Sequence, residues 1–390
     1  TKSAQFPFHF WLPHAMAAPT PVSAYLHSAT MVKAGVFLIA RLWPVLAGTE
    51  LYTVTVTTVG LVTMIFGAGV ALFRHDLKSI LAYSTISQLG MLVMLLGFSL
   101  EAAAMAAVLH ILNHAAFKAA LFMSAGIVEH ETGTRDIRRL GGLAKAMPVT
   151  ALIATLAAAS MAGLPPLGGF ISKEAMLYET PRLALFGAAW LLPVLATIGA
   201  TFSVGYSLRL AMHLFFGKPR EAEPFARAHD PSPAMWAAPA LLTLVAVLLG
   251  LVPMWLAAPL VSAVTGAVTG SAPPAVELAL WHGVNLALIL SALAVAGGAL
   301  LLWRHAGLLA AWERASLPDA KFLFERCLRI ADRQVRKAIV AVHDPSLQRM
   351  LLASFAVTVL LILDGAIGGG GVLTGARTQL PVSVPAIVAW

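Results

Sequence analysis

Residues 102–128 read AAAMAAVLHILNHAAFKAALFMSAGIV and contain three ionisable side chains, His110, His114 and Lys118. An α-helix needs about 20 mainly apolar residues to cross the hydrocarbon core of a bilayer, and this stretch is long enough. The three ionisable positions are four residues apart, so they lie on one helix face in a column about 12 Å long. The stretch therefore predicts a membrane-spanning helix that carries a line of ionisable groups.

The composition of the whole chain agrees with a membrane location. Of 390 residues, 59% are hydrophobic and 11% are charged, whereas about 25% of a soluble domain is charged. The net charge of +8 would suggest nucleic-acid binding in a soluble protein, but the basic residues lie between apolar segments. No nucleic-acid partner is therefore expected. The single Cys327 cannot form an internal disulfide.

Further apolar segments predict an all-α, polytopic transmembrane helix bundle with discontinuous helices. The predicted spans are 22–44, 53–73, 80–99, 102–128, 147–180, 184–216, 234–258, 281–303 and 349–367. The fifth contains LPPLGG at residues 164–169, where prolines remove backbone donors. We interpret it as one crossing whose helix is broken at Pro165, Pro166, Gly168 and Gly169.

The distribution of Lys and Arg predicts the orientation of these spans. Basic residues are concentrated in the connections at 74–82, 129–147, 209–227 and 304–349, and the intervening connections hold little beyond Arg41 and Arg182. This alternation follows the positive-inside rule, which places the basic connections in the cytoplasm. Lys78 is assigned to the first basic loop, and Glu129 and Glu131 to a solvated second loop.

Two regions differ from the pattern of crossing helices. Residues 319–343 combine apolar positions at helical spacing with arginines on the other faces, which predicts a basic amphipathic helix lying on the membrane surface. A basic cytoplasmic linker is the alternative. The residues after 368 contain four glycines and then prolines, and are predicted to be irregular. Because Thr1 is not a start methionine, we expect a fragment that begins inside a larger membrane domain.

Ionisable side chains deep in spans are costly and are functional candidates. Lys33 lies at the middle of the first span, six residues after His27. The column of His110, His114 and Lys118 suits a proton relay, because neutral imidazole both accepts and donates a proton. Three alternatives stay open: a lysine in a local water pocket, a metal or haem site at the histidines, and histidines used only for helix packing.

Lysines also accompany both proline-rich segments. Lys173 and Glu174 follow the break in the fifth span, where water and unpaired backbone groups allow ions to be handled. An interfacial ion pair between these two residues is the alternative. Lys2 precedes a proline series that starts at Pro7, which repeats the arrangement of a lysine beside a broken helix.

Several of these stretches are long motifs that resemble a known family. They are KSAQFP (2–7), WLPHAM (11–16), PTPVSA (19–24), HSATMVKAG (27–35), DLKSILAYSTISQLG (76–90) and FISKE (170–174), together with the histidine–lysine helix. The chain from residue 1 to about 220 resembles the antiporter-type subunits of respiratory complex I, membrane-bound hydrogenases and Mrp-type Na+/H+ antiporters. Lys33 and HETGTRDIRRLGG (130–142) look most like the A-type subunit of the Mrp antiporters.

The resemblance implies two inverted five-helix repeats, each with a lysine on a broken helix. Lys2 would belong to the first repeat and Lys173 to the second, with Glu174 at the exit side. The central hydrophilic axis would contain His27, His110, His114 and Lys118. The glutamate that pairs with the first-repeat lysine in this family lies upstream of the present sequence.

The resemblance also suggests a division of the chain and a function. We expect an antiporter-like domain at 1–216, additional spans at 217–318, a lateral amphipathic helix at 319–343, and a final span with its tail at 344–390. Protons would pass along Lys2, Lys33, Lys118 and Lys173, coupled to Na+ export elsewhere in a multisubunit complex in the cell (inner) membrane. The expected partners are the other subunits, the lipid bilayer, protons and Na+.

No metal or other cofactor is expected, and the chain is interpreted as part of a secondary ion transporter and not as an enzyme. One alternative is a proton-pumping subunit of a redox-driven complex I or hydrogenase, in which this chain carries no redox centre. A second alternative is a self-contained solute transporter with a midplane substrate pocket.

Overall fold

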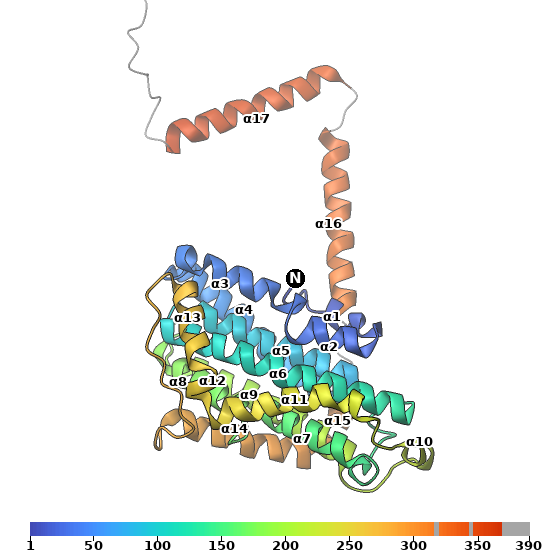
Figure 1. Ribbon diagram of the computed structural model, residues 1–390. Helices are drawn as coiled ribbons and strands as arrows, with labels where there is room; N and C mark the ends of the chain where they lie inside the picture. The colour runs from blue at the N-terminus through green and yellow to red at the C-terminus, as the bar shows by residue number, and fades with distance from the viewer. Residues whose placement is uncertain (316–319, 343–345, 369–390) are drawn as a thin grey trace, which may run out of the picture. The chain divides into compact units, whose positions relative to one another are not determined.

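The computed structural model describes residues 1–315, 320–342 and 346–368. These residues form helices and no β-strand, which confirms the all-α prediction. Contacts divide the chain into two units, Thr1–Ala320 and Lys321–Trp390. Figure 1 shows the long helices of the first unit lying side by side.

Eight helices of the described residues are long and apolar enough to cross a membrane. They are Thr20–Leu46 (α2 with α3), Glu50–Phe73 (α4), Leu77–Gly97 (α5), Glu101–Thr132 (α6), Leu191–Phe215 (α9), Pro233–Leu251 (α11), Leu286–Trp303 (α14) and Leu347–Gly365 within α17. Together with the broken crossing described below, they confirm a polytopic helix bundle.

Side-chain caps fix where several of these helices begin. The Asp76 carboxylate accepts a hydrogen bond from Ser79 N at 2.8 Å at the start of α5, and Asn285 Oδ1 accepts one from Leu288 N at 2.8 Å at the start of α14. Such caps satisfy backbone donors that have no partner within the helix. Helices in a bilayer depend on them because lipid offers no alternative acceptor.

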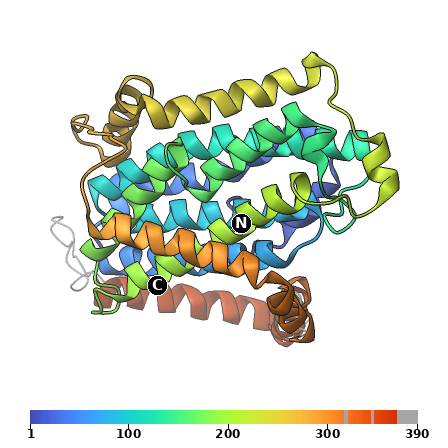
Figure 2. The ribbon, with the colours of Figure 1, turned by 90° about the horizontal axis from the view of Figure 1, so that it is seen from below.

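Helix α5 lies at the centre of the first unit and is buried along its whole length. It packs against α4 through glycines: a Cβ atom on Gly60 would lie 2.3 Å from Met94 N, and one on Gly90 would lie 2.4 Å from Met64 N. Small residues allow such close helix contact in membranes. Figures 1 and 2 show α5 and α6 inside the unit, with α14 at the lower edge of the first view and α11 at the upper edge of the second.

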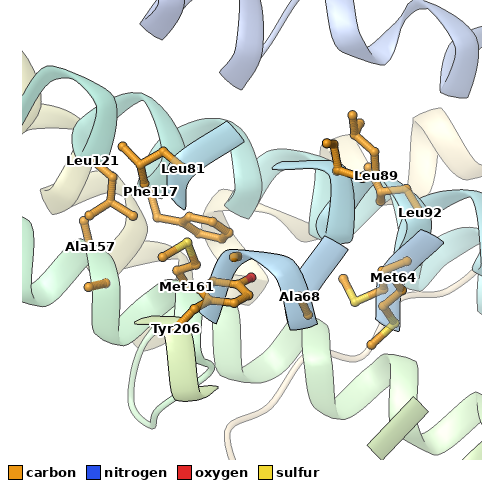
Figure 3. Packing of buried hydrophobic residues seen from close by; sticks show 14 of the residues in the cluster. Met64, Ala68, Leu81, Leu89, Leu92, Phe117, Leu121, Ala157, Met161 and Tyr206 are labelled. Carbon is orange, nitrogen blue, oxygen red and sulfur yellow. The ribbon is translucent and has the colours of Figure 1, made fainter. Parts of the chain in front are cut away.

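The apolar core surrounds these central helices. Figure 3 shows part of it, with Leu121 and Ala157 at one end, Leu89 and Met64 at the other, and Met161 between them. All five side chains are buried. The polar groups described below therefore lie in surroundings from which bulk water is excluded.

The predicted break in the fifth span is present. Helix α7 (Pro148–Ala162) ends at Gly163, which has a φ of +83°, and α8 (Gly168–Glu179) begins after the two prolines. Gly168 and Gly169 are needed for close packing, because a Cβ on Gly169 would lie 1.8 Å from Ser160 O. Pro165 and Pro166 themselves are exposed.

The span predicted at 22–44 is present, but it is broken into two helices, which was not predicted. Helix α2 (Thr20–Ser28) stops, a 3-10 turn spans Met31–Lys33, and α3 (Ala34–Leu46) follows. The backbone leaves the helical region at Thr30, with φ −111° and ψ −97°. Pro7 lies in the turns that precede α1 (Trp11–His14) and is exposed.

The region between α11 and α14 also differs from the prediction. The predicted span 234–258 is too long, because α11 ends at Leu251 and a new helix begins at Pro253, whose ring cannot continue the preceding helix. Two short helices follow, α12 (Pro253–Leu256) and α13 (Ala258–Thr269). The next span begins at Leu286 and not at residue 281.

Short helices complete the first unit. They are Ala15–Ala17, Leu143–Lys145 and Thr180–Arg182, all 3-10, with α10 (Ala222–Arg227) and α15 (His305–Arg314).

The second unit contains α16 (Ala320–Val342) and α17 (Leu347–Gly368). Helix α16 confirms the predicted amphipathic helix and carries an ion pair between Arg336 and Asp332 at 3.5 Å. Residue 319, residue 343 and the predicted irregular tail after 368 lie outside the described residues.

Candidate functional site

A continuous chain of buried hydrogen bonds connects His110 of α6 with Lys173 of α8. His110 Nε2 lies 2.8 Å from Gln88 Oε1, Gln88 Nε2 donates to Ser203 Oγ at 3.2 Å, and Lys173 Nζ donates to the same Ser203 oxygen at 2.8 Å. Tyr206 OH accepts from Gln88 Nε2 at 2.8 Å and lies 2.9 Å from Ser203 Oγ. Four helices, α5, α6, α8 and α9, thus contribute to one connected polar network.

The network favours one arrangement of hydrogens on His110. Because Gln88 Nε2 is already a donor to two hydroxyl groups, its Oε1 accepts from His110 Nε2–H. His110 Nδ1 is then an acceptor for the Ser172 hydroxyl, 2.9 Å away. Hydroxyl groups and imidazole can reverse these roles, which proton transfer requires, whereas the Gln88 amide keeps its roles and fixes the positions of its neighbours.

The broken helix places the ammonium of Lys173. Its Nζ donates to Met161 O at 2.7 Å and to Ala162 O at 3.1 Å, the last two carbonyls of α7. Carbonyls at a helix C-terminus lack partners within the helix and carry the negative end of its dipole. The break therefore creates a site for a cation inside the bundle.

Lys118 contacts Met161, the residue whose carbonyl also binds Lys173. Its Nζ donates to Ser84 Oγ of α5 and lies 3.6 Å from Met161 Sδ. In the part of the chain that the structure describes, no carboxylate forms an ion pair with Lys33, Lys118 or Lys173. Buried charges without a counterion interact strongly, because the surroundings screen them poorly.

The second break, in the first span, supplies partners for His114. Its Nδ1 lies 3.3 Å from Ser28 O, the carbonyl of the last residue of α2. Lys33, just beyond this break, donates from Nζ to Ile111 O at 3.0 Å. His114 and His110 lie with ring centroids 6.1 Å apart. The side chains of α6 are thus approached by a broken helix from each side.

Two of the histidine nitrogens on α2 and α6 have no hydrogen-bond partner in the described structure. They are His114 Nε2 and His27 Nδ1, both buried. The His27 ring lies 6.1 Å from the ring of Phe122, one turn beyond Lys118 on α6. Buried polar atoms without protein partners are the places where water is expected.

Glu174 turns away from the network and does not pair with Lys173. Its carboxylate is hydrogen-bonded by the side chain of Asn285 and lies near His282. It lines a cavity of about 420 Å³. The predicted alternative of an interfacial Lys173–Glu174 ion pair is therefore not what the structure forms.

The structure brings together most of the predicted pathway residues and leaves two apart, Glu174 and Lys2. His110, His114, Lys118 and Lys173 share the buried region with Lys33 and His27. Lys2 is exposed. Both ring nitrogens of His110 have hydrogen-bond partners, and the described residues contain no group of three His, Cys, Asp or Glu side chains that could hold a metal ion.

The uncharged members of the network were not predicted. They are Ser84, Gln88, Ser172, Ser203 and Tyr206. Their side chains are not ionisable, so the cost of burying a charge does not single them out, although Ser84 and Gln88 stand in the quoted motif at 76–90. Their four-residue spacing, which matches that of His110 and His114, is a signal that would have identified the facing surface of α5.

The ends of α5 and α6 that carry Lys78 and Glu129 differ from the prediction. Lys78 is not in a loop: it lies in the first turn of α5, is buried, and pairs with Glu129 at 3.0 Å. Glu129 and Glu131 are not in a solvated loop either, because α6 continues to Thr132. The Glu131 side chain is only 8% exposed and lies 3.1 Å from His229.

A second polar cluster ties the connection after α4 to α9 and α15. Arg209 donates to Leu72 O at 2.7 Å and Arg74 O at 2.6 Å, and His305 Nε2 lies 3.2 Å from the same Leu72 oxygen. Burial, and then the charge of Arg209, lower the pKa of His305. The pKa of His75 is lowered by burial and then by Arg138 and Arg209.

The fold and the buried network define a polytopic membrane protein with ionisable groups at two broken helices. Residues 1–203 match the family model described as NADH:quinone oxidoreductase/Mrp antiporter, transmembrane region, and the chain belongs to this family. The resemblance given by the sequence motifs is thereby confirmed.

Individual relatives agree with this assignment. The chain is 52% identical over 299 residues to the A/B subunit of a probable K(+)/H(+) antiporter of Rhizobium meliloti (strain 1021), covering 76% of this chain and 30% of the relative. It is 44% identical over 308 residues to the A1 subunit of a Na(+)/H(+) antiporter of Staphylococcus aureus (strain JH9), covering 74% and 38%.

A solved structure of the Mrp complex from Dietzia sp. DQ12-45-1b matches with a TM-score of 0.77 and 36% identity. The match covers 99% of this chain and 42% of that chain. The chain thus spans less than half the length of each of these three relatives.

Proposed function

We propose that this chain is a proton-translocating membrane subunit of a multisubunit monovalent cation/proton antiporter. The observation that carries the proposal is the hydrogen-bond chain from His110 through Gln88 and Ser203 to Lys173. The named relatives, which belong to a Na+/H+ and a K+/H+ antiporter, support the antiporter assignment. The exchanged cation is Na+ or K+, and it crosses elsewhere in the complex.

Protons move between the amines of Lys118 and Lys173, which are protonated in turn. Met161 accepts from Lys173 through its carbonyl and contacts Lys118 through its sulfur, so the two amines are neighbours in a region of low dielectric. A proton on one amine repels a proton on the other, and the two sites titrate as a coupled pair. Arrival of a proton at Lys118 therefore drives release from Lys173.

The contacts of His114 with Ser28 and of Lys33 with Ile111 extend this coupling toward Lys33. His114 lies between Ser28 and His110, and Lys33 is held at Ile111 on the same helix. Water at the unpaired nitrogens of His114 and His27 would join these groups. The route then runs laterally through the middle of the bundle, with Lys2 as its candidate continuation into the first repeat.

The membrane potential and the proton gradient set the direction of transport. The basic connections mark the cytoplasmic side, and Glu174 lies toward the opposite ends of the helices, beside the start of α14. Glu174 is accordingly the exit group. Coupling to cation movement follows if the cation binds where it changes the charge of one lysine in the series.

A redox-driven pump is the second candidate, because the matching family includes NADH:quinone oxidoreductase subunits. It predicts the same buried network but a different energy source. The two are separated by whether a cation gradient alone moves protons.

The test uses inverted vesicles from antiporter-deficient cells that carry the full-length protein with its partner subunits. Na+ or K+ is added without redox substrate, and internal pH is followed. We expect cation-dependent proton release in the wild type and in Lys145→Ala, which removes an exposed lysine, and none in Lys173→Ala. Proton movement that appears only with NADH or ferredoxin would assign the chain to the redox-driven pumps instead.

A further inference from the structure

A cavity with several ionisable side chains in its lining lies at the ends of α8 and α14 that face away from the basic connections. It has a volume of about 420 Å³. Its ionisable lining consists of Glu174, Tyr178, Glu179, Arg182, Glu277 and His282. The last two come from the irregular segment between α13 and α14, which the pathway described so far does not use.

Most of these charges are already paired or solvated. Arg182 lies 3.0 Å from the buried carboxylate of Glu179 and stacks on the ring of Tyr178 at 4.7 Å. Glu277 is exposed. Glu174 is the one buried carboxylate of the described cavity lining whose partners are uncharged or titratable, namely Asn285 and His282.

Asn285 fixes the orientation of the Glu174 carboxylate. Its Oδ1 accepts from Leu288 N as the cap of α14, so its amide group is left to donate to Glu174. The N-terminus of α14 also contributes a positive dipole end near the carboxylate. Asn285 is therefore a positioning residue that holds Glu174 toward the cavity.

His282 shares the cavity with Glu174 and is open to solvent. It is exposed, lines the same cavity and interacts electrostatically with Glu174. A neutral imidazole can both accept and donate a proton.

We propose that His282 is the outer proton-transfer residue of this chain, exchanging protons between Glu174 and the external solution through this cavity. In the outward direction the Glu174 carboxylic acid gives its proton to a neutral ring nitrogen of His282. The resulting imidazolium releases a proton to water and returns to the neutral ring. In the inward direction the same bonds form and break in reverse. The inference rests on the proposed antiport function and adds the residue at its outer end.

The experiment uses right-side-out vesicles that carry the complete complex and are preloaded with Na+ or K+. Dilution into cation-free medium drives the cation out and protons in through the outer mouth, and an internal dye reports acidification. We expect His282→Ala to slow acidification by about tenfold, less than the ~10² or more that a general acid–base group contributes, because water still enters the cavity. His14→Ala, which removes another exposed histidine, serves as the matched control and should match the wild type.

Chemical rescue distinguishes proton transfer from a structural effect. External imidazole should restore most of the His282→Ala rate, whereas a bulky buffer of the same pKa should not, because the cavity admits only small molecules. A His282→Ala rate equal to the wild type at every external pH would overturn the inference. So would a slow rate that imidazole leaves unchanged.

The two proposals fail in different ways. If the wild type shows no cation-driven acidification, the antiport function fails. If the wild type and His14→Ala exchange normally and His282→Ala does too, only the role of His282 fails. Cation-driven flux in all three proteins is therefore measured in the same preparation.

Discussion

Lys173 is held by Met161: the lysine Nζ donates to the methionine carbonyl at 2.7 Å, at the end of α7. The same methionine contacts Lys118 through its sulfur at 3.6 Å. A helix break thus does two things at once, because it frees carbonyls that bind an ammonium and it brings a second lysine to the same residue.

The packing of the helix break predicts a large effect of one added methyl group. A Cβ on Gly169 would lie 1.8 Å from Ser160 O, whereas a Cβ on Gly69 of α4 would meet nothing within 4 Å. Gly169→Ala should therefore lower the free energy of unfolding by about 1–3 kcal/mol, the usual cost of overpacking. Gly69→Ala should be neutral or slightly stabilising. Thermal unfolding of the two variants in detergent measures the difference, and equal melting temperatures would contradict the described break.

The Lys78–Glu129 ion pair predicts non-additive effects. Lys78 is buried while Glu129 is one-third exposed, at 33%, so the loss of Glu129 leaves a poorly solvated amine. We expect Glu129→Gln to destabilise the protein by about 1–2 kcal/mol, less than the 3–5 kcal/mol of a fully buried pair because water screens the carboxylate. Adding Lys78→Met should recover part of that loss. A double variant whose destabilisation equals the sum of the single ones would show that the pair does not interact.

His75 and His305, the histidines of the polar cluster around Arg209, predict the pH dependence of stability. Burial and arginine charges lower the pKa values of His75 and His305, so both rings are neutral in the folded protein at a pH where the unfolded chain begins to bind protons. The contribution of these two neutral rings to the free energy of unfolding is fully present above about pH 6.5. It is lost as the pH falls through their lowered pKa values. The melting temperature should therefore decrease between about pH 7.5 and about pH 5.5.

His305→Gln provides the matched comparison for this pH effect. A glutamine amide can still donate to Leu72 O, which His305 Nε2 contacts at 3.2 Å, but it does not titrate. The variant should show a flatter pH dependence than the wild type. An unchanged slope would mean that the pKa of His305 is similar in the folded and unfolded states.

Local patterns in the sequence were sufficient to predict much of this fold. The column of His110, His114 and Lys118 depends on helical spacing alone, and the proline pair at 165–166 indicates a break without reference to any neighbour. The break after Ser28 could not be predicted in this way, because residues 29–33 contain neither proline nor glycine. It is accompanied by a tertiary contact, from the Ser28 carbonyl to His114.

The network residues that were not predicted also depend on tertiary contacts and not on a local sequence pattern. Gln88 and Ser203 are uncharged, and their importance comes from lying between two ionisable groups that are distant in sequence. Glu129 was assigned to solvent because its partner Lys78 lies on another helix. The sequence predicts which residues face the inside of the bundle, but pairing across helices is determined by their packing.

The central claim is that the buried network joining His110 and Lys173 carries protons and depends on Gln88 to hold its members in place, and one measurement tests it directly. Cation-driven proton flux is compared in vesicles carrying the complete complex as wild type, Gln88→Leu and Met91→Leu, the last being a volume-conserving change at a buried neighbour on α5. Expression and assembly are checked in each case. We predict that Gln88→Leu lowers the flux by about tenfold or more, because it removes both the acceptor of His110 and the donor to Ser203. Flux at the wild-type rate in Gln88→Leu would contradict the account.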